Sequence, residues 1–90
     1  MSANNEDQIL DTVRAIPEGF VRTYGDIWPP APRLTGRVLK TTTEPVPWWR
    51  VVRADGSLAA GEEQRARLLE EGVPIRSGRV DLAKARLPDG

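Results

Sequence analysis

The segment Pro47-Trp48-Trp49-Arg50-Val51 holds the side chains whose chemistry is most distinctive in this sequence. Each indole offers a large apolar face and one N–H donor, but no nucleophile. The 90 residues contain no Cys and no His, so they cannot supply the thiolate and neighbouring base that nucleophilic alkyl transfer requires. We therefore predict that the segment holds a ligand rather than reacting with it.

Stacking against a base is one adequate use of such a segment. An extruded nucleobase that stacks on an aromatic side chain contributes about 1–3 kcal/mol. Adjacent side chains of an extended segment point to opposite sides, so we expect one of Trp48 and Trp49 in the core and the other in a pocket. The alternative is that both indoles, and Tyr24, are ordinary packing residues.

A second set of candidate residues is basic. Arg33, Arg37 and Lys40 recur at i, i+4 and i+7, on one side of a helix predicted over residues 32–40. Gly36 lies between them, where it would let another backbone approach closely. The pattern predicts a nucleic-acid contact; the alternative is a solvated basic face with an incidental Gly.

The charge distribution also points to an anionic partner. Residues 1–21 carry four acidic residues and one Arg, whereas residues 22–53 carry six basic and two acidic residues. Basic residues are mostly Arg, which suits bidentate phosphate and base-edge contacts. GC-rich codon usage is an alternative source of the Arg bias.

Composition excludes several classes of function. Without Cys or His, the usual zinc and iron sites are not expected, and we predict no metal and no cofactor. No apolar run approaches the length that spans a membrane. We expect one domain over residues 1–90, in the cytoplasm.

The elements that position these residues are predicted to be mostly helical. Ile9, Val13 and Ile16 share one face of a helix over Asn5–Ile16, with a capping-box pattern at Asn5 and Gln8. Residues 62–71 predict another helix, ended by Gly72, and residues 81–86 a single helical turn.

A helix-turn-helix is predicted between the first helix and the two adjacent indoles. The run Thr23-Tyr24-Gly25-Asp26 has a helix-start pattern, and prolines then end that short helix near Trp28. The helix over residues 32–40 follows, with Leu34 and Val38 toward the core. Residues 51–58, with an Asp-Gly turn, predict a β-hairpin that would be the wing.

Several runs, in order, resemble one known family. Residues 16–27, 33–39 and 45–52 resemble the opening, the recognition helix and the active-site motif of the DNA-binding domain of alkylguanine-DNA alkyltransferases, and residues 53–56 and 68–73 continue the match. Trp48 and Trp49 stand where that family has its alkyl-accepting Cys and the following His. Trp in place of the Cys is typical of alkyltransferase-like proteins, which transfer nothing.

The resemblance implies a non-enzymatic domain that binds O6-alkylguanine in double-stranded DNA and flags it for nucleotide excision repair. The helix over residues 32–40 would enter the minor groove, and Arg33, or alternatively Arg37, would fill the place of the extruded base. Tyr24 would rotate the phosphate, and Glu71 would be a relay carboxylate without its Cys or His. The implied lesion pocket comprises Trp48, Tyr24, Trp49 and Val51. The implied DNA contacts are Arg33, Gly36, Arg37, Lys40 and Thr23.

Two other functions remain open at this point. The same scaffold could bind DNA without lesion specificity, with Trp49 filling the pocket, or it could be a protein–protein module. This scaffold usually works as a monomer, which we also expect here.

Overall fold

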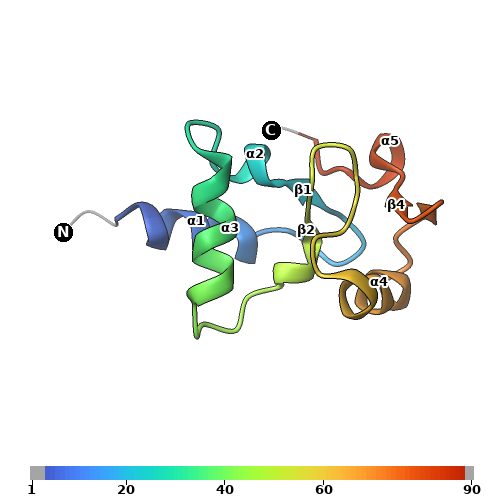
Figure 1. Ribbon diagram of the computed structural model, residues 1–90, viewed down its shortest axis with the longest axis horizontal. Coiled ribbons are helices and arrows are strands. Elements are labelled where there is room, and N and C mark those ends of the chain that lie inside the picture. The colour runs from blue at the N-terminus through green and yellow to red at the C-terminus, as the bar shows by residue number, and fades with distance from the viewer. Residues whose placement is uncertain (1–3, 89–90) are drawn as a thin grey trace.

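The computed structural model describes residues 4–88 and shows a mostly helical winged helix-turn-helix (Figure 1). Helices α1, α2 and α3 lie at one end, strands β1 and β2 in the middle, and α4, the β3–β4 hairpin and α5 at the other end. The elements are α1 (Asn5–Arg14), β1 (Arg22–Thr23), α2 (Tyr24–Ile27), α3 (Pro32–Thr41), the 3₁₀ turn η1 (Trp48–Arg50), β2 (Val51–Val52), α4 (Gly61–Glu70), β3 (Ile75–Arg76), β4 (Arg79–Val80) and α5 (Leu82–Ala85).

Helix α1 begins one residue away from the predicted cap. The carboxamide oxygen of Asn4, not Asn5, accepts the backbone N–H of Asp7 at 2.8 Å. The helix also ends at Arg14 rather than Ile16, because the chain turns there ahead of Pro17. The predicted apolar face is nevertheless the one that is buried.

The helix-turn-helix begins as predicted. The Thr23 hydroxyl accepts the N–H of Asp26 at 3.1 Å, and the Asp26 carboxylate accepts the N–H of Thr23 at 3.0 Å, which completes the capping box of α2. Thr35, fully buried on α3, donates its hydroxyl to the Tyr24 carbonyl at 3.2 Å. This bond fixes the two helices against each other. On the core side of α3, Val38 is buried and Leu34 half-buried.

The hairpin predicted over residues 51–58 is wrong in its strand pairing, although its turn forms: the Gly56 N–H donates to the Arg53 carbonyl at 2.8 Å and the Arg53 N–H to the Ser57 carbonyl at 3.1 Å. Strand β2 instead pairs in parallel with β1, with Arg22 opposite Val51 and Thr23 opposite Val52. Val51 and Val52 are both fully buried, a pattern typical of an interior parallel strand rather than a wing. Within residues 4–88, the antiparallel hairpin is formed by β3 and β4 around the turn at residues 77–78.

Two apolar clusters meet at β2. Val51 belongs to the cluster under α1, α2 and α3, whereas Val52 belongs to the cluster under α4, the hairpin and α5. Because successive strand side chains point to opposite faces, this strand joins the two halves of the molecule. In the part of the chain that the structure describes, no helix has the length and apolar character needed to cross a membrane.

Candidate nucleic-acid interface

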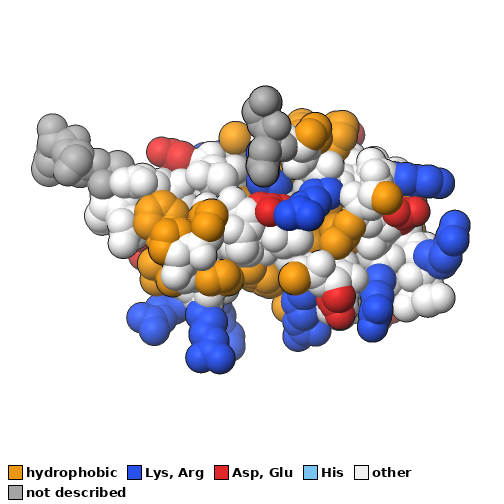
Figure 2. All heavy atoms as spheres, turned by 90° about the horizontal axis from the view of Figure 1, so that it is seen from above, with side chains coloured by type: hydrophobic (Ala, Val, Ile, Leu, Met, Phe, Trp, Pro, Cys, Tyr) orange, Lys and Arg blue, Asp and Glu red, His pale blue; other side chains and the backbone are white. Residues whose placement is uncertain are grey.

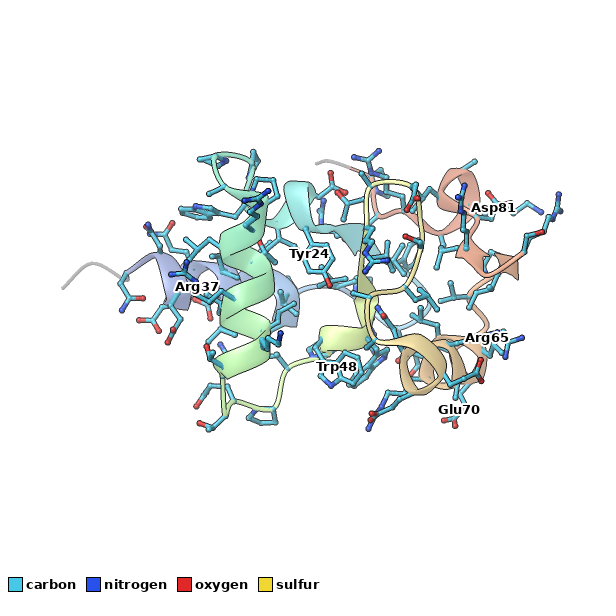
Figure 3. All side chains as sticks on the ribbon, in the orientation of Figure 1. Tyr24, Arg37, Trp48, Arg65, Glu70 and Asp81 are labelled. Atoms are coloured by element: carbon cyan, nitrogen blue, oxygen red, sulfur yellow. The ribbon has the colours of Figure 1, made fainter. Side chains whose placement is uncertain are left out.

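A cavity of about 770 Å³ opens between α3 and the loop that follows β2. Tyr24 and Trp48 lie in this gap, one above the other (Figure 3). The cavity is lined by Tyr24, Pro32, Arg33, Gly36, Arg37, Leu39, Lys40, Trp48, Arg53, Ala59, Ala60 and Gln64. It therefore brings together residues from both sequence motifs, the basic helix and the segment with the two indoles.

Tyr24 and Gly36 form one wall of the cavity. A Cβ added to Gly36 would lie 3.8 Å from the ring atom Cε1 of Tyr24, so the Gly leaves the ring edge open. Burial raises the pKa of the Tyr24 phenol, and the nearby charge of Arg53 only partly opposes this. The phenol is therefore a neutral hydrogen-bond donor at physiological pH.

Trp48 forms the opposite wall. The segment is a 3₁₀ turn, not the extended segment that was expected, and successive side chains of such a turn are about 120° apart because it has three residues per turn. The ring planes of Trp48 and Trp49 meet at 87°, with centroids 5.8 Å apart. Trp48 faces the cavity and packs on the first apolar cluster, whereas Trp49 packs on the second.

Trp49 is held by a carboxylate rather than exposed to a ligand. Its Nε1 donates to Glu71 Oε2 at 2.9 Å, and the Arg50 guanidinium donates to the same carboxylate at 2.7–3.2 Å. Arg50 also donates to the carbonyl of Ile16 at 2.8 Å. We call Trp49, Arg50 and Glu71 the Glu71 anchor.

Within the Glu71 anchor, the Glu71 carboxylate stays ionised and is neutralised by Arg50. Burial would raise the pKa of Glu71, but the hydrogen bonds from Arg50 and Trp49, with a longer one from the N–H of Gly19, outweigh it and hold the pKa below its usual range. The two charged side chains are only 14% and 10% exposed. No Cys or His is present for Glu71 to hydrogen-bond as a relay carboxylate, and its carboxylate instead binds Trp49 and Arg50.

Two residues of this region carried no clear sequence signal. The side-chain nitrogen of Gln64, 1% exposed, donates to the carbonyls of Val51 and Trp49 at 2.8 and 3.0 Å. The guanidinium of Arg67 lies 4.6 Å from the Trp49 ring centroid and 5.8 Å from that of Trp48. The only hint was that Gln64 lies four residues before the buried Leu68, on the apolar face of α4.

All the charged side chains that line the cavity are cations. No carboxylate lines it, and the side chains of its four cations form no hydrogen bond or ion pair within residues 4–88; these are Arg33, Arg37, Lys40 and Arg53. Most Arg residues outside the cavity pair with carboxylates, namely Arg14, Arg50, Arg65, Arg67, Arg79 and Arg86, although Arg76 forms no ion pair within residues 4–88. Lys and Arg side chains project along the lower edge of the view in Figure 2. Unpaired cations beside an apolar wall suit a polyanionic partner that carries a flat apolar group.

Three of the residues predicted for the site lie outside the cavity lining. Thr23 is 5% exposed and its hydroxyl caps α2, and Val51 is fully buried behind the indoles. Trp49 borders a separate hollow with Arg14 and Pro47, which Trp48 also lines. The cavity is therefore not filled by Trp49.

The chain is similar to proteins that bind damaged DNA. Residues 4–73 match the model of the family "6-O-methylguanine DNA methyltransferase, DNA binding domain". The Escherichia coli DNA base-flipping protein is 41% identical over 88% of this chain and 70% of its own length. Alkyltransferase-like protein 1 of Schizosaccharomyces pombe is 36% identical over 91% of this chain and 88% of its own. The structure of S. pombe Atl1 in complex with damaged DNA containing O6-carboxymethylguanine superposes with a TM-score of 0.83 at 27% identity, covering 99% of this chain and 100% of that one.

Proposed function

This chain belongs to the family of the 6-O-methylguanine DNA methyltransferase DNA-binding domain, and from that premise we propose that it binds O6-alkylguanine in double-stranded DNA without transferring the alkyl group. The observation that carries the proposal is the cavity of about 770 Å³ between Trp48 and the basic edge of α3. It leaves room for a purine, and it combines an aromatic wall with cations whose side chains have no partner within residues 4–88.

Base flipping is the step that would bring the lesion into this cavity. Extruding a base costs a few kcal/mol, and less when its pairing is already damaged. Alkylation at O6 removes the N1 proton of guanine and so weakens its pair with cytosine. The lesion is therefore easier to extrude than guanine, and its alkyl group gains an apolar contact with Trp48.

Each residue around the cavity would contact a different part of the DNA. With α3 in the minor groove, Arg33 at the rim would enter the gap that the flipped base leaves, and Tyr24 would contact the rotated phosphate. Arg37 and Lys40, further along the same edge, would bind the phosphate backbone. Gly36 would let the backbone come close to α3.

The bound alkyl group would remain on the guanine. Trp48 has no nucleophilic atom, and Trp49 cannot act as a base, because the lone pair of an indole nitrogen belongs to the aromatic ring and its N–H can only donate. The complex would thus persist on the DNA, as a monomer, and mark the lesion for nucleotide excision repair proteins.

Fluorescence anisotropy with two matched duplexes, one with a single O6-methylguanine and one with guanine, tests the proposal. We expect tighter binding to the lesion, weakening as salt rises, and the methyl group still on the DNA after incubation. Equal affinity for both duplexes would favour a DNA-binding domain without lesion specificity. Absence of salt-dependent binding would leave only a protein-interaction role.

A further inference from the structure

Arg53 and the other cations of the cavity extend from different elements of the fold. Arg33, Arg37 and Lys40 extend from α3, whereas Arg53 extends from the loop after β2 and lines the cavity from there. Its side chain is exposed and forms no hydrogen bond or ion pair with any residue between 4 and 88. It is therefore free to bind a group that enters the cavity.

The nearest carboxylate in the sequence does not neutralise Arg53. One oxygen of Asp55 accepts the N–H and the hydroxyl of Ser57 at 2.9 and 2.6 Å, and the other lies 3.8 Å from Arg79. Asp55 is thus committed to its own turn and to the β3–β4 hairpin. The charge of Arg53 instead reaches the Tyr24 phenol, where it partly offsets the effect of burial on the pKa.

The wall beside Arg53 is short and carries no competing charge. Ala59 and Ala60, which also line the cavity, have small uncharged side chains. The amide of Gln64 is occupied, since its nitrogen donates to the Val51 and Trp49 carbonyls and its oxygen accepts the N–H of Ala60. A negatively charged substituent would therefore meet only cations here, and a positively charged one would meet no carboxylate.

We propose that this cavity selects among O6-alkylguanines by charge, favouring adducts whose alkyl chain ends in a carboxylate, and that Arg53 is the cation that pairs with this carboxylate. The inference rests on the proposed function, because it assumes that the flipped base occupies the cavity. The cations on α3 bind phosphates whatever the adduct is, whereas Arg53 pairs with the carboxylate of the adduct itself.

Three duplexes of one sequence test the inference, with O6-carboxymethylguanine, O6-carbamoylmethylguanine or guanine at one position. The acid and the amide have nearly the same shape and differ in charge. We expect the acid to bind about fivefold more tightly than the amide at low salt, the size of an ion pair that stays partly hydrated. The difference should shrink as salt rises.

Two variants that each lose one positive charge assign the effect to a residue. Arg53→Gln should bind the acid and the amide equally while still preferring both to guanine. Arg76→Gln removes an exposed cation of β3 that lies outside the cavity lining and forms no ion pair within residues 4–88, and it should keep the preference for the acid. Arg53→Glu should reverse the order and favour O6-(2-aminoethyl)guanine. Circular dichroism would verify that each variant is folded.

The outcomes separate this inference from the function on which it rests. If the acid and the amide bind equally well, and both better than guanine, charge selection is wrong and lesion binding stands. If none of the adducts binds better than guanine, both proposals fail. If Arg53→Gln weakens binding to all three duplexes by one common factor, Arg53 is a phosphate contact and the assignment is wrong.

Discussion

Trp48 and Trp49 are neighbours in the chain, but their surroundings are opposite. Trp48 faces an open cavity whose cations have no partner within the described residues, whereas Trp49 belongs to the Glu71 anchor, where every charge is paired. A single step along the 3₁₀ turn η1 therefore leads from the cavity wall to the Glu71 anchor. Unpaired cations repel one another and are tolerated at the cavity because the anchor and the core supply stability elsewhere.

The largest expected effect comes from breaking the anchor. Glu71→Gln leaves the Arg50 guanidinium, 14% exposed, without its counter-ion, and should lower the free energy of unfolding by about 2–3 kcal/mol. Urea denaturation followed by circular dichroism measures this. The control Glu70→Gln changes an exposed carboxylate on the preceding residue and should have little effect. Equal stabilities of the two variants would show that the anchor stabilises nothing.

Removing Arg33 should have the next largest effect, on binding instead of stability. Arg33→Ala should weaken binding to an O6-methylguanine duplex about tenfold to a hundredfold, because the gap in the base stack loses its filler. Its melting temperature should not change, since the side chain has no partner among residues 4–88. The control is Arg65→Ala, an exposed Arg of α4. Unchanged lesion affinity would exclude Arg33 as the inserted residue and make Arg37 the candidate.

Acid should weaken the anchor without any mutation. The pKa of Glu71 lies below its ordinary value of 4.5, so the unfolded chain takes up this proton more readily than the folded protein. The stability that Glu71 contributes is therefore present above that pH and is lost as pH falls through the lower, folded-state pKa. Asp26 and Asp55 also have lowered pKa values, so the difference between wild type and Glu71→Gln isolates Glu71. A difference that does not change with pH would contradict this account.

Gly36 offers a test in which stability and binding move in opposite directions. Gly36→Ala should raise the free energy of unfolding by up to about 1 kcal/mol through helix propensity, since its Cβ would meet Tyr24 Cε1 at an ordinary 3.8 Å. The added methyl group should nevertheless weaken DNA binding, because it stands where another backbone approaches. Thermal melting and anisotropy measure the two effects. Gain of stability with unchanged affinity would show that the Gly is incidental.

Introducing a thiol at position 48 alone should not produce alkyl transfer. Trp48→Cys is expected to transfer no methyl group, because the Trp49 indole beside it has no basic nitrogen to form the thiolate. Mass spectrometry of the protein after incubation with O6-methylguanine DNA measures transfer. A methylated Cys would refute the argument that the residue after Trp48 determines reactivity.

The sequence predicted the fold and the family through local signals. The capping box at Thr23 and Asp26, the apolar period of α1 and the stop at Gly72 each depend on residues within one or two helical turns. The basic edge of α3 is likewise set by spacing along one helix. Errors arose where a local pattern is compatible with two strand pairings. The valines before the Asp-Gly turn, for example, pair with β1 instead of with the residues that follow the turn.

The sequence by itself determined that the chain is mostly helical, that α3 has a basic edge and that no thiolate stands beside Trp48. Only the tertiary structure decided which indole faces the cavity, that Glu71 binds Trp49 and Arg50, and that Arg53 lies across the cavity from α3. The physical reason is the distance along the sequence between the residues that interact. Caps and periods act between residues a few positions apart, whereas these contacts join side chains that are brought together only when both apolar clusters close on β2.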